Sequence, residues 1–112
     1  MTNSGDAPPY TYLADISDLE PHGQLTKWVD DHDVLVYRHE GGIRAISNIC
    51  RHFGGPVGYH KMKEGVFTCL WHSYQFSASD GRCLNHANMQ LREYRLKTDG
   101  SKIFVQLVEV PS

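Results

Sequence analysis

Two short segments of the sequence each carry one cysteine and one histidine: Cys50-Arg51-His52 and Cys69-Leu70-Trp71-His72. Residues 53–68 separate them and include the glycine pair Gly54-Gly55. Thiolates and imidazoles are the ligands that zinc and iron–sulfur centres use, so the four side chains are candidates for one metal site. The fold must then bring two loops together at one end of its scaffold.

The rest of the chain alternates short β-branched and aromatic runs with turn signals, which is typical of strands joined by hairpins. The dipeptides Gly41-Gly42, Asp80-Gly81 and Asp99-Gly100 tolerate the positive φ angles that tight hairpins need. We therefore predict an all-β fold, an antiparallel β-sandwich or partly open barrel. The predicted strands are Tyr10–Ile16, Leu25–Val29, Val34–His39, Ile43–Ile49, Val66–Leu70, Tyr74–Ser77, Leu91–Lys97 and Ile103–Val110.

The length of 112 residues is enough for one domain with one hydrophobic core. Residues 1–9 have neither a basic start nor an apolar centre, so we expect a disordered leader there rather than a signal peptide. Residues 10–112 are then a single domain. Within it, the segment Ser17–Gly23 predicts one helical turn, capped by Ser17 with Glu20 three residues later.

Composition and charge exclude several kinds of partner. The net charge is −2 and there is no polybasic run, so we expect neither nucleic acid nor a membrane surface as a partner. No apolar run approaches the ~20 residues that span a bilayer. Three cysteines, an odd number without an export signal, argue against a disulfide framework and for a reducing compartment. We expect a cytoplasmic protein.

The order of the four candidate ligands closely resembles that of the Rieske [2Fe–2S] family, in which two cysteines hold one iron and two histidines hold the other. The resemblance implies one [2Fe–2S] cluster, with Cys50 and Cys69 on one iron and His52 and His72 on the other. It also implies that each histidine binds through Nδ1 and leaves Nε2 at the surface. The two histidines are then the expected exit for the electron.

The resemblance extends from about Tyr12 to Val108 and implies cluster-binding loops at about residues 50–60 and 69–76. The positions that match the family pattern are Gly54, Pro56, Val57, Trp71, Phe76 and Asp80-Gly81-Arg82. The positions that depart from it are Arg51, Leu70 and Ser73. The segment Cys83–Met89 holds no proline, where many relatives cover the cluster with a proline-containing loop.

The departures place the chain in one branch of that family. Respiratory members carry two further cysteines that form a disulfide, and Gly55 and Trp71 stand at those positions here. Respiratory members also use a serine and a tyrosine to donate hydrogen bonds to sulfur, where this chain has Tyr74 and Phe76. Fewer such donors stabilise the reduced cluster less, so we expect a potential near the bottom of the roughly −150 to +300 mV Rieske range.

Side chains near the two loops have less specific interpretations. Cys83 is interpreted as core packing. His86, with Asn85 and Asn88, either bonds to a ligand or is a solvated loop residue. Core packing is expected of Trp71 and Phe76, and partial exposure of Phe53, Pro56 and Val57 around the exposed histidines. Surface positions are expected for His22, His32, His39 and His60.

These observations favour a Rieske-type ferredoxin, a stand-alone monomeric one-electron carrier and not itself an enzyme. The resemblance implies a flavin-containing reductase as donor and a terminal oxygenase as acceptor, as in dioxygenase systems. A second hypothesis makes the chain a Rieske subunit of a larger enzyme, such as an NADH-dependent nitrite reductase, or the Rieske part of an oxygenase. A third is a structural zinc domain, which is less favoured because zinc sites usually pair cysteine with cysteine and histidine with histidine.

Overall fold

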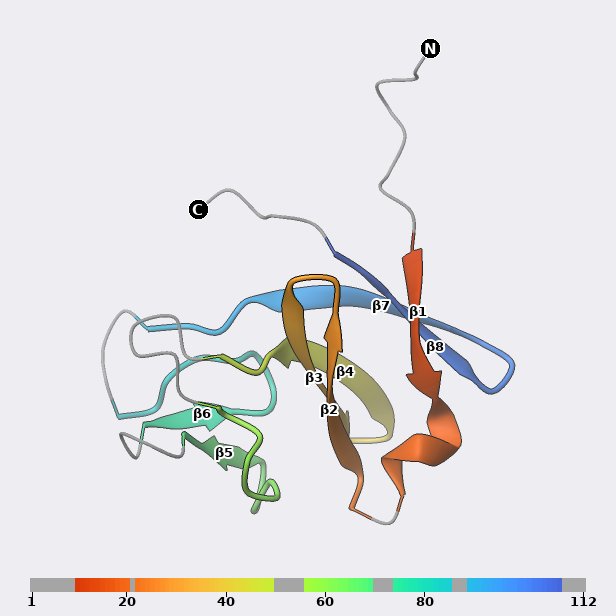
Figure 1. The fold of residues 1–112 in the computed structure, drawn as a ribbon. Coiled ribbons are helices and arrows are strands. Elements are labelled where there is room, and N and C mark those ends of the chain that lie inside the picture. The colour runs from red at the N-terminus through yellow and green to blue at the C-terminus, as the bar shows by residue number, and fades with distance from the viewer. Residues whose placement is uncertain (1–9, 21, 50–55, 70–73, 86–88, 108–112) are drawn as a thin grey trace.

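The computed structural model describes residues 10–20, 22–49, 56–69, 74–85 and 89–107 (Figure 1). Six strands form one antiparallel sheet in the order β1-β8-β7-β4-β3-β2, and two form a second sheet, β5-β6. The elements are β1 (Tyr10–Asp15), η1 (Ile16–Leu19), β2 (Gln24–Val29), β3 (His32–His39), β4 (Gly42–Ser47), β5 (Val66–Thr68), β6 (Gln75–Ser77), β7 (Glu93–Asp99) and β8 (Lys102–Gln106). The predicted antiparallel all-β fold is confirmed.

Each predicted strand overlaps an observed one, but the hairpin turns begin at other residues than expected. His39 pairs with Gly42, so the turn between β3 and β4 is Glu40-Gly41, with φ angles of 51° and 82°. Two-residue turns that match the strand twist need positive φ at both positions, so the turn imposes this conformation on Glu40. The prediction of Gly41-Gly42 as the turn was therefore wrong by one residue.

The predicted helical turn exists, but its cap was assigned to the wrong residues. It is a 3-10 turn that follows β1 directly, and the backbone N–H of Asp15 donates to the Asp18 carboxylate at 3.0 Å. The predicted cap, Ser17, lies inside the turn. Glu20 instead receives a hydrogen bond from Arg38 at 3.0 Å. β1 ends at Asp15 and the 3-10 turn begins at Ile16, so Asp15 is the capping residue, two positions before the predicted Ser17.

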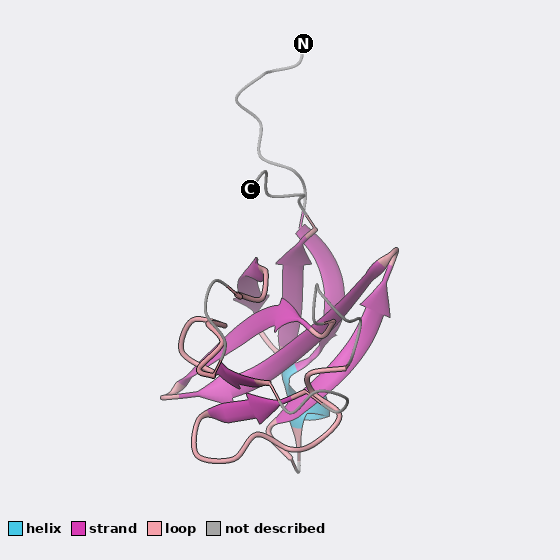
Figure 2. Cartoon of the chain, turned by 90° about the vertical axis from the view of Figure 1, so that its left-hand side faces the viewer, coloured by secondary structure: helices cyan, strands magenta, loops and turns pink. Residues whose placement is uncertain are grey.

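The six-stranded sheet bends into two halves, which explains its barrel-like shape (Figures 1 and 2). β4 and β7 pair at only two positions, Ala45 with Tyr94 and Ile46 with Glu93, and beyond them β7 pairs with β8 alone. The first core lies between the halves. It consists of Leu13, Ala14, Leu19, Val34, Val36, Ala45, Tyr94, Ile103 and Val105.

A second core lies between the outer face of the large sheet and the β5-β6 sheet. β3 contributes Leu35 and Tyr37 to it, the alternate residues to the two valines of the first core. β3 is thus buried on both faces, which accounts for the uninterrupted apolar run from Val34 to Tyr37. The other members are Ile46, Val57, Phe67, Cys69, Phe76, Ala78, Cys83, Met89 and Leu91.

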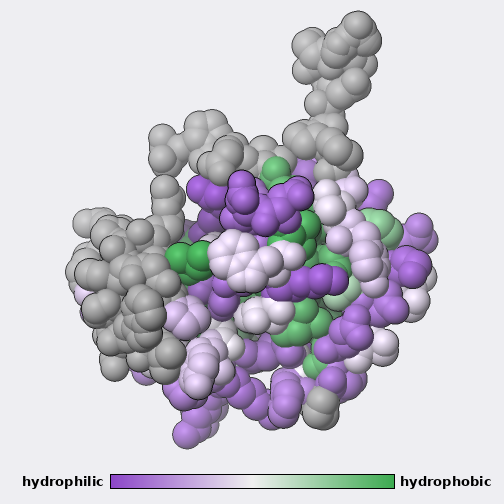
Figure 3. All heavy atoms as spheres, in the orientation of Figure 1, coloured by the Kyte–Doolittle hydropathy of each residue, from purple (hydrophilic) through white to green (hydrophobic). Residues whose placement is uncertain are grey.

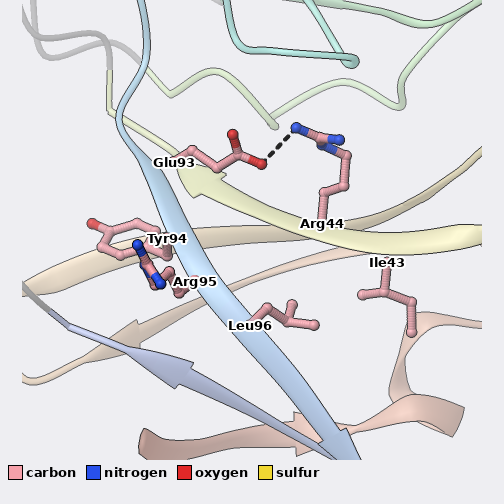
Figure 4. Close-up of a pocket in the computed structure, with 6 residues that line it drawn as sticks. All are labelled: Ile43, Arg44, Glu93, Tyr94, Arg95 and Leu96. Carbon is pink, nitrogen blue, oxygen red and sulfur yellow. Dashed lines mark hydrogen bonds and ion pairs between the residues drawn. The ribbon is translucent and has the colours of Figure 1, made fainter. Parts of the chain in front are cut away.

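A hollow of about 370 Å³ marks the place where β4 and β7 diverge (Figure 4). The Arg44 guanidinium donates to the Glu93 carboxylate across it, with 2.6 Å between Nη2 and Oε2. The remaining lining residues are Ile43, Tyr94, Arg95 and Leu96. Ile43 and Leu96 also pack against the first core, so the hollow follows from the bend of the sheet.

Most of the described surface visible in Figure 3 is hydrophilic, with apolar residues in small separate areas. No helix in the described ranges is long and apolar enough to cross a membrane.

Tyr37 forms a joint between the two sheets inside the protein. Its ring packs edge-on against Phe67, with 4.8 Å between the ring centroids, and its hydroxyl donates to the Ala78 carbonyl. Burial raises the pKa of Tyr37 to about 12, although the nearby Arg44 cation opposes the shift.

The substitution Tyr37→Phe tests this joint through the pH dependence of stability. The folded protein keeps the phenol proton up to about pH 12, whereas the unfolded chain loses it near 10.0. The wild-type free energy of unfolding should therefore fall as pH rises through this window, by about 1.4 kcal/mol at pH 11 from this group alone. Tyr37→Phe should cost about 1–3 kcal/mol near neutral pH and lack that part of the fall. Urea unfolding at the two pH values measures both; an equal alkaline loss in the variant would contradict the assignment.

Candidate metal centre

Cys69 is the only one of the four predicted ligands within the described residues. Cys69 directly follows β5, and only 1% of its surface is exposed to solvent. Cys50, His52 and His72 lie outside the described residues. No group of three or more histidine, cysteine, aspartate or glutamate side chains that could hold a metal is found in the described part of the chain. The segments on either side of the two predicted loops, however, are described in full detail.

Asn48 joins the two ends of the first loop. Its backbone carbonyl accepts from the N–H of Val57 at 2.7 Å, and its side-chain Oδ1 accepts from the N–H of Gly58, also at 2.7 Å. Ile49 and Pro56 form an isolated β-bridge next to this pair. Ile49, the last described residue before the predicted ligands, therefore lies next to Pro56, the first described residue after them.

Asn48 is in turn fixed by β3. Its side-chain Nδ2 donates to the Asp33 carboxylate at 3.0 Å, and its backbone N–H donates to the Asp33 carbonyl at 2.8 Å. Asn48 is buried, and each of these polar groups has a partner, as buried polar groups require. The described residues before and after the predicted ligands Cys50 and His52 are thus anchored to β3, a strand with four consecutive buried residues.

A second side-chain amide holds the last residues of the predicted first loop and the segment that follows it. Gln24, on β2, donates from Nε2 to the carbonyls of Gly58 and His60 at 3.3 and 3.2 Å. Its Oε1 accepts from the N–H of Met62 at 2.7 Å. The sequence analysis did not identify Gln24 or Asn48 as part of the site, and neither lies in a recognisable motif.

Gly58 lies in direct contact with β3. A Cβ atom at this position would come within 2.7 Å of Leu35 Cδ1 and 3.0 Å of Asn48 Oδ1. Real Cβ atoms do not approach other heavy atoms so closely. The absence of a side chain at Gly58 therefore lets the segment after the first loop pack onto the sheet while it receives the Asn48 hydrogen bond.

The second loop has an equally defined base. The N–H of Cys69 donates to the Tyr74 carbonyl at 2.8 Å, and β5 and β6 pair as a hairpin just below it. On the other side, Asn85 Oδ1 accepts from the N–H of Gln75 at 3.0 Å and from the Cys83 thiol at 3.4 Å. Asn85 thus contacts the strand that follows the second loop, whereas His86 and Asn88 lie outside the described residues.

The structure confirms some predictions for neighbouring side chains and corrects others. Phe76 and Cys83 are buried in the second core, as predicted. Val57, for which partial exposure was expected, is fully buried in the same core, because the Asn48 hydrogen bond draws it against the sheet. Tyr59 is exposed, whereas Phe53 and Trp71 lie outside the described residues.

Two of the four histidines expected at the surface are only partly exposed. The His39 side chain is only 13% exposed, and its Nε2 lies 3.2 Å from Ser79 Oγ. His32 is half-buried, with Nδ1 3.0 Å from the Tyr94 hydroxyl. Both have partners that are 40 or more residues away, which local polarity cannot reveal. His22 and His60 are exposed, as predicted.

The described residues fit an iron–sulfur centre of the predicted kind. Both loop bases converge on the second core, since Val57 and Cys69 belong to the same buried cluster. Cys69 offers a thiol that is shielded from water among apolar residues, and thiolates are the ligands that iron–sulfur clusters use. The described residues on both sides of Cys50 and His52 are hydrogen-bonded to each other through Asn48, so these ligands would be presented from a fixed base.

Comparison with known proteins supports this interpretation. The family described as Rieske [2Fe-2S] domain matches residues 10–98. The ferredoxin component of an alkene monooxygenase system from Xanthobacter autotrophicus is 34% identical over 84 residues, which cover 74% of this chain and 69% of the relative. The solved structure of the ferredoxin of carbazole 1,9a-dioxygenase from Nocardioides aromaticivorans superposes with a TM-score of 0.72 at 25% identity, covering 86% of this chain and 97% of that one.

The chain is also similar to part of a larger protein. The oxygenase subunit of glycine betaine monooxygenase from Pseudomonas aeruginosa is 34% identical over 99 residues, which cover 78% of this chain but 23% of that subunit. The same type of domain therefore occurs both in small ferredoxins and as a fraction of an oxygenase subunit.

The substitution Gly58→Ala should disturb the base of the first loop. The added methyl group must displace Leu35 or the Asn48 amide, at a cost of about 1–3 kcal/mol in unfolding free energy. Gly42→Ala is a matched control, because its Cβ would meet nothing closer than the His39 carbonyl at 3.8 Å. Urea unfolding and iron content of both variants measure the effect. Equal stability of the two variants would show that Gly58 is not constrained by this contact.

Proposed function

The chain belongs to the Rieske [2Fe-2S] domain family, and on this basis we propose that it carries single electrons from a flavin-containing reductase to a terminal oxygenase. The observation that carries the proposal is its likeness to a ferredoxin component over most of both chains, at 34% identity. The fold likeness to the carbazole dioxygenase ferredoxin, which it covers almost completely, adds support. We further propose that residues 10–112 act as one monomeric unit in the cytoplasm.

The proposed ligands are Cys50 and Cys69 for one iron and His52 and His72 for the other. When bound, a [2Fe–2S] cluster supplies reversible one-electron chemistry. The described residues would position the ligands. Cys69 holds its thiol in an apolar core, Asn48 holds the backbone of Val57 after the first pair of ligands, and the Tyr74 carbonyl fixes the backbone of Cys69.

The apolar surroundings of the second loop favour a low reduction potential. Phe76 is fully buried and has no hydrogen-bond donor on its side chain. Hydrogen bonds to sulfur stabilise the reduced, more negative state, so their loss lowers the potential. A carrier of low potential suits a flavin-containing donor and would oxidise quinols poorly.

A second function is favoured by the likeness to the glycine betaine monooxygenase oxygenase subunit. The domain would then transfer electrons inside a larger enzyme, as it would in a nitrite reductase. Gel filtration of the native protein separates the two, since a carrier should run as a small free species. A structural zinc domain remains the non-redox alternative, and metal analysis decides it.

The substitution Cys69→Ser tests the proposed ligand set. Replacing a thiolate ligand by a hydroxyl should remove most of the iron and acid-labile sulfide, which in the wild type should each number about two per chain. Cys83→Ser is the matched control, because Cys83 is also a buried thiol in the same core but is not a proposed ligand. Iron and sulfide assays with EPR of the reduced protein provide the measurement. Retention of the cluster in Cys69→Ser, or zinc in place of iron in the wild type, would disprove the assignment.

Reconstitution tests the proposed function itself. The reduced protein should titrate near the lower end of the roughly −150 to +300 mV range and should sustain product formation by a terminal oxygenase encoded beside it, together with its reductase. Omitting the carrier should reduce turnover to background. A midpoint above about +100 mV would contradict the low-potential assignment within that range. Cluster-loaded protein that reduces no such oxygenase would contradict the carrier function.

A further inference from the structure

A groove of about 320 Å³ lies between edge strand β2 and the segment that follows the first cluster loop. Its floor is rigid, because the Gln24 amide bonds to the backbone of Gly58, His60 and Met62. The groove thus begins two residues after the bridge that closes the first loop. The other lining residues are His22, Leu25, Thr26, Tyr59 and Lys61.

One exposed aromatic ring lines this groove, and a second lies on the same face of β2. Tyr59 is 66% exposed and lies edge-on to the His60 ring at 5.0 Å. Trp28 is 61% exposed and follows Gln24 and Thr26 at every second position of β2, so it lies on the same face of that strand. Exposed tryptophan and tyrosine side chains are typical anchors of protein–protein contacts.

The charge of the groove has one sign. Among the described residues that line it, Lys61 is charged and none is a carboxylate. Within the described ranges neither Lys61 nor the nearby Lys63 has an ion-pair partner, whereas Arg38, Arg44 and Lys102 each pair with an acidic residue. The protein as a whole has a net charge of −2, so Lys61 is a cation at the groove of an acidic molecule.

We propose that this groove is the docking site for an acidic surface segment of the electron acceptor. A carboxylate of the partner pairs with Lys61, and apolar side chains cover Tyr59 and Trp28. The contact is small, as electron-transfer encounters bury less than ~1,200 Å². It places the partner against Gly58, Tyr59 and Lys61, which follow the predicted ligands Cys50 and His52 in the chain. The identity of the partner rests on the proposed function, but the acidic chemistry rests on the groove alone.

The hollow between β4 and β7 is a weaker docking candidate. Its guanidinium, from Arg44, is already neutralised by Glu93 at 2.6 Å, and its apolar residues belong to the first core. The lysines on β7 and β8 are also less suitable. Lys97 lies over the Tyr10 ring at 4.7 Å, and Lys102 lies near Asp15. Lys97 therefore provides a control of the same charge on a different surface.

The first arm of the test needs no protein partner. The paramagnetic, redox-inert anion hexacyanochromate(III) is added to oxidised, ¹⁵N-labelled holoprotein, and the diamagnetic hexacyanocobaltate(III) serves as the reference of equal charge. Broadening should centre on the amides of Thr26, Gly58, Tyr59 and Lys61. Lys61→Glu should abolish it there, and Lys97→Glu should leave it unchanged. Broadening that is uniform, or that centres on Lys97, would overturn the proposal.

The second arm measures electron transfer to the oxygenase that accepts the electron in reconstitution. At low ionic strength Lys61→Glu should lower the second-order rate constant about 10-fold or more, and high salt should remove the difference. Lys97→Glu should change the rate constant less than about 2-fold by the same reasoning. The midpoint potentials should all agree. Equal rate constants for Lys61→Glu and wild type would overturn the proposal. Selective broadening without any electron transfer would instead count against the proposed function and leave the acidic docking site standing.

Discussion

The two-sided burial of β3 is the constraint on which the rest of the structure depends. Val34 and Val36 face the core inside the bent sheet, whereas Leu35 and Tyr37 face the core under β5 and β6. β3 therefore fixes how the β5-β6 sheet packs against the six-stranded sheet. Because the carboxylate and carbonyl of Asp33, at the start of the same strand, hold Asn48, the base of the first loop takes its position from this strand.

The fold class could be predicted because strand propensity and turn residues are local signals. The errors concern properties that depend on pairing. The turn at Glu40-Gly41 is set by the register of β3 against β4, and a glycine pair in the sequence does not specify which of its residues closes the hairpin. The cap at Asp15 likewise depends on where β1 stops pairing with β8. Residue type alone indicated a capped turn but could not select the capping residue.

The predicted site shows a similar division between local and distant information. The ligand order is a short-range motif, so it could be read from the sequence and led to the right family. Gln24 and Asn48 could not be found in this way, because Gln24 bonds to residues 34 to 38 positions away and Asn48 to one 15 positions before it. His39 was misplaced for the same reason, since polar neighbours suggested solvent while its partner is Ser79.

The arrangement separates three tasks that an electron carrier must combine. Side-chain amides fix the backbone of the loop bases, apolar residues around Cys69 control the electrostatic environment, and exposed cations provide a surface for encounter. Brief docking requires weak binding, yet transfer requires a cluster that does not shift when a partner arrives. The groove meets both requirements. A partner that contacts Tyr59 and Lys61 would touch a segment whose backbone Gln24 already holds through three hydrogen bonds.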